Sequence, residues 1–549
     1  MNADCINATS VATTPAALVV RGDFSAVSHA PLDLQETPKE IQKEFTAFIP
    51  PLHKRFKGVN LAMAVTISAV AHQLECVFTF LVFCIVFPFL LLGLAILRVG
   101  KYLIERYIAF TRKCIPFHED DAVWQQDRAT NRHIVPAVMV VEGQPDIRKL
   151  RKIICERIVY GKDEKGARIC PRLTQVVQRH LRYYVWKEDE NFSIEKQVLN
   201  WTGEYPKRLE DLDRTISEIC STPLPEGLSP WQFIVVPILE ENYFVLLLRI
   251  HHSIADGVAL TRVFVKNFYD VPPQGAEPKK FSTKQRVYMW CKAMIVGPLM
   301  VLTKFFAKSD RSSIHGQELC GKKVVALSKN VDLSLVKQVK NVAGTTVNDV
   351  MVSCLAGALH DYLKCRDNCD VAKLDDMWAY VPVDIRASTH SVKLKNKFAL
   401  VSLRLPIEAK SAVDRLLATK QRMDIIKTSA EPMVTATTVQ ILMMLPEFIS
   451  RSLIDFFSRK ATCVLSNVPG PLQTLYLGGQ KIDEGIFWVP QRANIGVGLS
   501  IFSYGGGIRV GVYCDENVIP KPKEVVEKFE KNFRQLVHEL NINENEESN

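Results

Sequence analysis

The feature that most constrains this 549-residue chain is an uninterrupted run of 22 residues without a formal charge, at positions 76–97. As an α-helix, 22 residues reach about 33 Å at about 1.5 Å per residue, which is enough to cross the hydrocarbon core of a bilayer. A buried helix of a soluble domain is the alternative, but such a helix seldom needs so many consecutive positions without a charge. We therefore predict a membrane span at 76–97.

Residues 58–74, just upstream, are also uncharged and form a weaker candidate span, because polar side chains such as Asn60 and His72 interrupt them. Basic residues flank both outer ends of the pair: Lys54, Arg55, Lys57, Arg98, Lys101 and Arg106. Since cytosolic flanks carry the excess of Lys and Arg, this pattern favours a hairpin at 58–97 with both ends in the cytosol, and a single span is the alternative. Neither segment is predicted to be a cleavable signal peptide, because both begin too far from the N-terminus.

Composition excludes some classes of protein and leaves others open. The net charge of +10 suits anionic lipid headgroups or the phosphates of a nucleotide-like ligand, and no basic run interleaved with aromatic residues points to nucleic acid. The 14 cysteines are scattered, and Cys365 and Cys369 have no second pair to complete a zinc site. We expect reduced thiols that face the cytosol, and neither a nucleic acid nor a metal ion as partner.

The length predicts two or three folded units, and both main blocks mix strands with helices, so the predicted fold class is α+β. We expect mobile ends at 1–45 and 541–549, a first lobe at 115–270, a linker at 271–322 and a second lobe at 323–540. Within the linker, the apolar residues 293–303 are too short to span a membrane, and they suit a core helix and a helix on the bilayer surface equally well.

Individual elements follow from hydrophobic periodicity and turn residues. The first lobe ends in a predicted hairpin whose strands are 232–239 and 243–250. In the second lobe we expect strands at 323–327, 378–383, 397–405 and 461–465, a hairpin from 495–503 and 508–514, and helices near 333–342, 347–363, 412–426 and 521–540.

The run HHSIADG, residues 251–257, begins where the second strand of the first hairpin ends. Neighbouring side chains of an extended chain point to opposite faces, so one imidazole can enter a channel while the other packs behind it; this argues against one shared metal. An imidazole titrates near neutrality and can take a proton from a hydroxyl. We expect Asp256 to fix the loop by pairing with an Arg, and Gly257 to adopt a backbone angle that other residues resist. The alternative is a histidine pair satisfied in a polar turn.

Other catalytic signatures are absent: the sequence has no GxSxG nucleophile elbow, no GxxxxGK[ST] phosphate loop and no HExxH zinc site. The run HHSIADG resembles the HHxxxDG motif of the bifunctional wax ester synthase/diacylglycerol acyltransferase family, in the coenzyme A-dependent acyltransferase superfamily. Ser229-Pro230-Trp231 resembles the PLW element of that family without its Leu, so only Trp231 is carried over, as a structural residue. Further likeness, spread over about 115–540, lies in Asn348-Asp349 (the ND motif) and in residues 381–386 and 466–471.

The resemblance implies two chloramphenicol acetyltransferase-like lobes with a central tunnel, which coenzyme A and the acceptor enter from different sides. It implies that His252 is the general base, that His251 supports it, and that Asp256 and Gly257 shape the loop. Asn348 and Asp349 would face the site from the other lobe, Asn348 either as a donor to the developing oxyanion or as a helix-terminal residue that satisfies backbone donors. Arg386 is the candidate partner of Asp256.

The function that these expectations define is a membrane-anchored O-acyltransferase that moves a fatty acyl group from acyl-CoA to a fatty alcohol, a diacylglycerol, or both. We expect direct transfer without an acyl-enzyme, no bound metal or organic cofactor, and catalytic lobes that face the cytosol at the endoplasmic reticulum. Two alternatives stay open: the same fold acting on another acceptor, such as a sterol, a small alcohol or an amine, and a lipid-binding membrane protein without activity.

Overall fold

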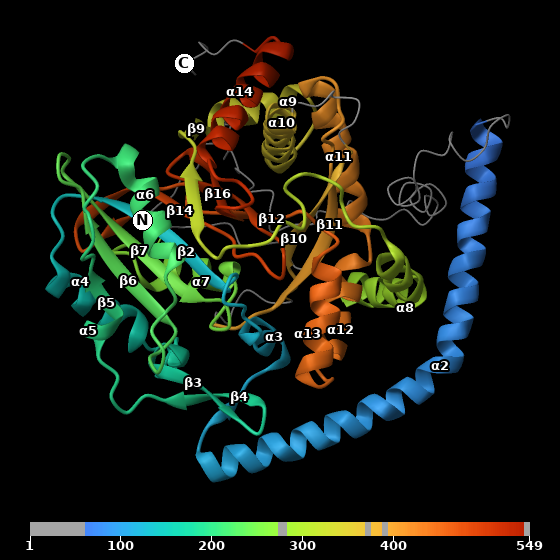
Figure 1. Cartoon of the computed structure of the whole chain (residues 1–549), viewed down its shortest axis with the longest axis horizontal. Coiled ribbons are helices and arrows are strands. Elements are labelled where there is room, and N and C mark those ends of the chain that lie inside the picture. The colour runs from blue at the N-terminus through green and yellow to red at the C-terminus, as the bar shows by residue number, and fades with distance from the viewer. Residues whose placement is uncertain (1–60, 273–282, 368–374, 387–393, 543–549) are drawn as a thin grey trace, which may run out of the picture.

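The computed structural model describes residues 61–272, 283–367, 375–386 and 394–542. The mobile ends predicted at 1–45 and 541–549 therefore lie outside the described residues, apart from 541 and 542. Between these ends the chain forms two lobes around two large sheets, with a long helix running along the outside (Figure 1).

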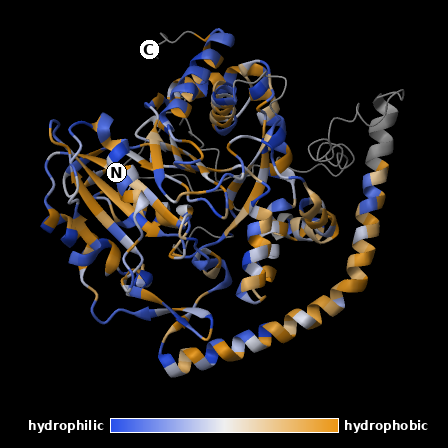
Figure 2. Cartoon of the chain, viewed as in Figure 1, coloured by the Kyte–Doolittle hydropathy of each residue, from blue (hydrophilic) through white to orange (hydrophobic). Residues whose placement is uncertain are grey.

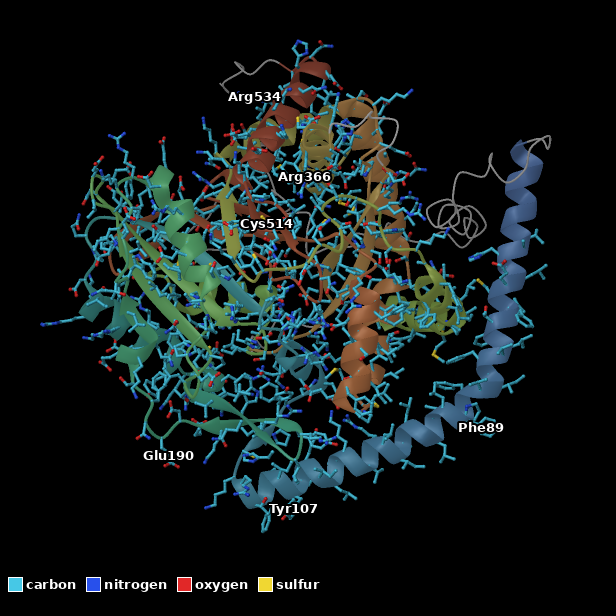
Figure 3. The ribbon with its side chains drawn as sticks, viewed as in Figure 1. Phe89, Tyr107, Glu190, Arg366, Cys514 and Arg534 are labelled. Carbon is cyan, nitrogen blue, oxygen red and sulfur yellow. The ribbon has the colours of Figure 1, made fainter. Side chains whose placement is uncertain are left out.

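The long outer helix is α2, Leu61–Arg112, which continues for 52 residues through both predicted membrane segments. The predicted hairpin is therefore wrong for the described residues, which form one helix, and the membrane span itself stays a prediction. The reason is local: only Glu75 separates the two segments, and Glu favours helix. Pro88 lies inside the helix, and α2 bends near Phe89 (Figure 3), as a proline that removes a backbone donor and clashes with the preceding turn allows.

The C-terminal part of α2 joins the helix to the body of the protein. Lys101 donates to Glu119 at 3.2 Å, and Arg98 pairs with the same carboxylate. Ile108 packs against Cys114 and Val185. The chain then enters a three-stranded sheet in the order β1-β4-β3, formed by β1 (Ile115–Pro116), β4 (Tyr183–Glu188) and β3 (Gln175–His180).

The N-terminal lobe is built on a six-stranded sheet in the order β13-β14-β2-β7-β6-β5. Its strands are β2 (Ile134–Glu142), β5 (Val198–Asn200), β6 (Trp231–Pro237), β7 (Tyr243–His251), β13 (Tyr476–Leu477) and β14 (Gln480–Phe487). β7 and β6 form the predicted antiparallel hairpin, and β7 also pairs with β2, which places His251 opposite Ile134. Both faces of these central strands are buried, which explains why they read as continuous apolar runs rather than as alternating ones.

The C-terminal lobe has a seven-stranded sheet in the order β11-β10-β12-β15-β16-β8, with β9 paired to β16. Its strands are β8 (Lys323–Leu327), β9 (Val331–Asp332), β10 (Met377–Asp384), β11 (Phe398–Leu405), β12 (Cys463–Pro469), β15 (Val497–Tyr504) and β16 (Gly507–Asp515). One apolar core joins this sheet to four helices: α9 (Leu333–Val342), α10 (Val347–Asp367), α11 (Ala412–Thr428) and α14 (Lys523–Glu539). The mixed strands and helices confirm the predicted α+β class.

Two consecutive strands of the second block of sequence, β13 and β14, belong to the sheet of the first lobe, which corrects the simple division at residue 323. β14 pairs antiparallel with β2, with Ile486 opposite Val138, so it belongs to the N-terminal sheet. The local sequence of β14 predicts a strand but not the sheet to which the strand belongs. That choice depends on its fit to β2, which lies more than 300 residues earlier in the chain.

The remaining helices cover the faces and edges of the two sheets. They are α3 (Glu119–Ala122), η2 (Val123–Gln125), α4 (Ile147–Ile154), η3 (Cys155–Val159), η4 (Pro171–Thr174), α5 (Ile194–Gln197), η5 (Leu209–Asp211), α6 (Leu212–Ser221), α7 (Gly257–Asn267), α8 (Thr283–Phe306), α12 (Glu431–Leu442) and α13 (Glu447–Ser458). The predicted linker therefore contains a 24-residue helix, α8, which packs against α12 beside the C-terminal lobe (Figure 1).

Candidate active site

The two histidines of the HHSIADG run lie where β7 ends, and their rings contact different partners. His251 is the last residue of β7, and the backbone N–H of His252 donates to the carbonyl oxygen of His133 at 2.8 Å. The His251 ring lies 3.2 Å from Asp127 Oδ2 and 2.8 Å from Ser253 Oγ. The His252 ring meets Asn396 instead. The predicted divergence of the two imidazoles is therefore confirmed.

Asn396 determines which nitrogen of His252 carries the proton. Its Nδ2 lies 2.9 Å from Asp121 Oδ1 and 2.8 Å from the carbonyl oxygen of His252, and both of these atoms accept hydrogen bonds. The atom between them must therefore be the amide nitrogen, so the amide oxygen is the atom that faces His252 Nδ1 at 3.1 Å. Because an amide oxygen only accepts, Nδ1 carries the proton and Nε2 keeps a free lone pair.

Burial keeps the His252 ring neutral at physiological pH. The residue is 8% exposed, and the indole of Trp124 stacks on the imidazole with ring centroids 3.7 Å apart. Desolvation lowers the pKa of His252 to about 4, although the charge of Asp256 acts in the opposite direction. A buried, neutral imidazole with an unshared pair on Nε2 is the state that a general base needs.

Asp256 is the N-cap of α7 and also connects the two lobes. Its Oδ1 accepts from the backbone N–H of Ala259 at 2.9 Å, and its Oδ2 accepts from the backbone N–H of Lys397 at 2.8 Å. Arg386 pairs with Oδ2, which confirms the predicted partner. Since Arg386 and Lys397 follow the first lobe by more than 100 residues, Asp256 fixes the histidine loop to the C-terminal lobe.

Gly257 does not have the unusual backbone angle that we predicted. It is not among the described glycines with positive φ, and it is the first residue of α7, where any residue has a suitable conformation. A Cβ at this position would meet only the Cγ2 of Val468, at 4.0 Å. The prediction of a left-handed angle is wrong; the absence of a side chain instead leaves space at the wall of a cavity.

That cavity lies between α7 and strands β2, β7, β14 and β15. His252 itself does not line it, but Ile250 and Gly257, which flank the histidine loop, do. The lining is almost entirely apolar and includes Met139, Leu260, Phe264, Val468, Phe487 and Phe502. Such a surface suits an alkyl chain that extends from a reaction at the loop.

Asn348 and Asp349 open α10 in the other lobe, and they have separate roles. Asp349 Oδ2 accepts from the backbone N–H of Thr346 at 2.9 Å while the Thr346 hydroxyl accepts from the Asp349 N–H at 3.3 Å, so these two residues form a capping box. Asn348 Oδ1 accepts from Asn467 at 3.2 Å. Its buried Nδ2 has no hydrogen-bond partner among the described residues, which leaves that amide free to donate. The role of Asn348 as an oxyanion donor stays a prediction.

Trp231 is a structural residue, as predicted. It opens β6 with 1% of its surface exposed, and its indole N–H donates to the carbonyl oxygen of Leu173 at 2.9 Å. Its ring packs edge-on against Phe233 in the core of the N-terminal lobe. No hydrogen bond or ring contact among those described joins Trp231 to His252.

Sequence reasoning missed four residues around the histidines: Trp124, Gln125, Asp127 and Asn396. Gln125 Nε2 donates to Ser253 Oγ at 2.8 Å. The two oxygens of Asp127 lie 2.7 Å from His133 Nδ1 and 3.2 Å from His251 Nε2. Burial alone would raise the pKa of Asp127, but the two histidines outweigh it and hold that pKa well below its usual range. A WQQD run more than 120 residues before the motif carries no local signal of this contact.

Among the described residues, no group of three or more His, Cys, Asp and Glu side chains is placed to hold a metal ion. Two mixed sheets, with strands of the second block completing the sheet of the first lobe and a neutral buried histidine where the lobes meet, form a coenzyme A-dependent acyltransferase-like fold. A solved structure supports this class: the wax ester synthase/diacylglycerol acyltransferase of Marinobacter aquaeolei VT8 matches with a TM-score of 0.56 and 19% identity, over 78% of this chain and 100% of that chain.

Two family models then identify the family. The model of the wax ester synthase/diacylglycerol acyltransferase catalytic domain matches residues 119–308, and the model of the WS/DGAT C-terminal domain matches residues 394–537. The chain belongs to the wax ester synthase/diacylglycerol acyltransferase family, and it is an O-acyltransferase.

Curated relatives agree with this assignment over most of their length. The O-acyltransferase WSD of Acinetobacter baylyi is 24% identical over 389 residues, which are 64% of this chain and 82% of that protein. A probable diacylglycerol O-acyltransferase of Mycobacterium tuberculosis is 21% identical over 462 residues, which are 76% of this chain and 94% of that protein.

Proposed function

We propose that this enzyme transfers a long-chain fatty acyl group from acyl-CoA directly to the hydroxyl of a lipid alcohol, either a fatty alcohol or a diacylglycerol. The observation that carries the proposal is the buried, neutral His252, whose Nε2 is free and whose loop borders an apolar cavity. The names of the two relatives support the same class of reaction, because one is an O-acyltransferase and the other a probable diacylglycerol O-acyltransferase.

The proposed reaction begins when Nε2 of His252 takes the proton of the acceptor hydroxyl as its oxygen attacks the thioester carbonyl. An aliphatic alcohol is too weak an acid to attack efficiently without a base. The ring becomes an imidazolium, and its Nδ1–H bond to Asn396 Oδ1 then involves a charged donor and strengthens. The Nδ2 of Asn348 donates to the oxyanion of the tetrahedral intermediate.

The intermediate collapses when the carbon–sulfur bond breaks and coenzyme A leaves as a thiolate. A thiol has a pKa of about 8.5, so the thiolate needs little help to leave, and it accepts the proton from the imidazolium to restore the neutral base. One histidine therefore serves the whole cycle, and no acyl group is attached to the protein. The proposed reaction uses no metal or organic cofactor, so dialysis against a chelator should leave its rate unchanged.

The test uses membranes from cells that express the full chain, supplied with labelled acyl-CoA and with a fatty alcohol, a diacylglycerol, a sterol or an amine in turn. The proposal expects labelled wax ester or triacylglycerol, and a loss of about 10²- to 10⁴-fold in His252→Ala, the usual contribution of a general base. His538→Ala, an exposed histidine in α14, is the matched control and should stay fully active. Full activity of His252→Ala, or a stable acyl-protein formed from acyl-CoA alone, would refute the mechanism.

The cellular location that we propose is the endoplasmic reticulum membrane, with the catalytic lobes in the cytosol, where acyl-CoA is available. The apolar part of α2 supports membrane attachment, because residues 70–97 are mainly hydrophobic (Figure 2) and most of their side chains are exposed. Alkaline carbonate should fail to extract the protein from membranes, and protease added to sealed microsomes should digest the lobes. Extraction by carbonate, or lobes that resist protease until detergent is added, would contradict this location and orientation.

A further inference from the structure

We infer that α8 lies half-embedded along the surface of the bilayer and forms, together with α2, the face through which the lipid acceptor reaches the enzyme. α8 is exposed and apolar on the side that faces away from the protein. The residues exposed on this side include Val287, Trp290, Met294, Ile295, Leu302 and Phe306. A continuous exposed apolar surface of this kind marks an interaction site rather than ordinary protein surface.

A bilayer fits this surface better than a protein partner for two reasons. α8 lies against α2, whose apolar window is as exposed as its own, so the two helices form one continuous surface. α8 also contains no acidic residue, and its charged side chains are all basic, with Lys284 exposed near its start and Lys308 just beyond its end. Basic residues beside an apolar face are the pattern of helices that lie on anionic lipid headgroups.

The opposite side of α8 is attached to the protein, which decides between lying on the membrane and crossing it. Gly297 packs so closely that a Cβ there would meet Val434 of α12 at 3.2 Å. Lys292 Nζ donates to the carbonyl oxygen of Thr428 at 3.0 Å, and Lys304 donates to Ser402 at 2.9 Å and pairs with Glu431. A helix held along its length by such polar bonds cannot be surrounded by lipid, although its length and hydropathy would permit a span.

A series of contacts links this surface to the catalytic histidine. α12 separates α8 from α3, and Gln440 of α12 lies 3.5 Å from Asp120 of α3. The next residue, Asp121, bonds the Asn396 that holds His252. Bilayer contact at α8 therefore brings water-insoluble alcohols to the side of the enzyme where the base lies. This last step rests on the proposed function, whereas the membrane contact itself does not.

The membrane contact can be tested without any activity, because α8 carries an exposed native cysteine, Cys291. Intact membranes containing the full chain are treated with a membrane-impermeant maleimide, and labelled peptides are quantified by mass spectrometry. We expect Cys291 to stay unlabelled until detergent is added, while Cys365, which is exposed at the end of α10, reacts before it. Equal labelling of both thiols in intact membranes overturns the inference. The inference also fails if Cys291 stays unlabelled in detergent and the protein there has twice the mass of one chain, since a second copy would then cover α8.

The acceptor route is tested by a double variant, Trp290→Glu with Phe306→Glu, against Val342→Glu as a control on α9, where the side chain is 62% exposed. We expect the double variant to lose about tenfold or more of its rate with an acceptor in phospholipid vesicles, and to keep its rate with the same acceptor in detergent micelles. Equal rates in both carriers refute the route. If even the unmodified enzyme forms no ester in either carrier, the proposed function fails, and the labelling result stands independently.

Discussion

Replacing Asn396 by leucine tests whether the amide that holds His252 matters to catalysis. Leucine has a similar size but offers no acceptor to Nδ1, so the imidazole loses the group that keeps its proton on that nitrogen. In the Nε2–H tautomer the ring cannot accept a proton at Nε2. We expect kcat to fall about 10- to 100-fold while the KM for acyl-CoA stays nearly unchanged, because the lost bond matters most when the ring is charged.

The magnitude follows from the change in the Asn396 bond during the reaction. A hydrogen bond between neutral groups contributes about 1 kcal/mol net, and one to a charged group contributes about 1.5–3 kcal/mol. The transition state alone has the charged ring, so the substitution removes about 0.5–2 kcal/mol of selective stabilisation, or roughly 2- to 30-fold in rate. The fraction of enzyme that holds the wrong tautomer reduces the rate further.

The fold should tolerate the change, because Asp121 loses only one of its contacts. Its Oδ1 still accepts from the backbone N–H of Asn396 at 3.2 Å, and Arg172 still pairs with Oδ2. The substitution removes the four hydrogen bonds of the Asn396 side chain, to His252 Nδ1, Asp121 Oδ1 and the carbonyl oxygens of His252 and Ser253, so the thermal midpoint should fall by about 10 °C while the protein stays folded. Asn341→Leu, at an exposed position in α9, is the matched control and should change neither the rate nor the midpoint.

The assay measures initial rates over a range of acyl-CoA concentrations for Asn396→Leu, His252→Ala and the double variant. If Asn396 acts through His252, the double variant should be no slower than His252→Ala alone, since the amide has no base left to orient. The reasoning is refuted if Asn396→Leu keeps its kcat within twofold, or if it slows His252→Ala as much as it slows the unmodified enzyme.

Three further outcomes follow from the site. Because the pKa of His252 is lowered to about 4, kcat/KM measured from pH 3.5 to 8 should fall only near pH 4, and a midpoint near 6.5 would contradict a buried base. The same shift should lower the free energy of unfolding by about 3 kcal/mol as pH falls from 6.5 to 4, because His252 becomes charged in the unfolded chain first. Gly257→Ala should melt no lower than the unmodified protein, whereas Gly257→Phe should raise the KM for long acyl chains more than for short ones, and equal effects would remove the cavity from the site. Arg386→Gln should lower the free energy of unfolding by about 3 kcal/mol in denaturant titrations, since it leaves the buried Asp256 carboxylate without its cation; a loss below 1 kcal/mol would refute the pairing as a connection between lobes.

Many elements of the fold could be predicted, because at those positions the local pattern of apolar and turn residues agrees with the tertiary structure. β8 and α9 have the predicted bounds, and the hairpin of β15 and β16 is where alternating residues flank three glycines. The errors lie where a local pattern permits two outcomes. Residues 58–97 suit a hairpin or one helix, and β14 suits either sheet; its pairing with β2 is decided by contacts across more than 300 residues.

The site divides in the same way. His252, Asp256 and Gly257 share one short motif, so their proximity was predictable, and even the Arg386 partner of Asp256 could be anticipated. Asn396 could not, because a lone asparagine 144 residues from His252 has no pattern that points to an imidazole. Gly257 shows the opposite error: the residue matters for the space that it leaves, which only the neighbouring Val468 reveals.

The contacts of the histidine loop indicate that the two lobes must assemble before the base is competent. His252 belongs to the N-terminal lobe, but the group that fixes its tautomer, Asn396, comes from the second block of sequence, and so do Arg386 and Lys397, which hold the Asp256 end of the loop. An isolated N-terminal lobe would keep the HHSIADG run yet leave Nδ1 without its acceptor. It would also lose β14, and with it one wall of the apolar cavity. The tautomer of His252 is thus set at the interface between the lobes, and a motif located in one lobe depends on residues of the other for its geometry.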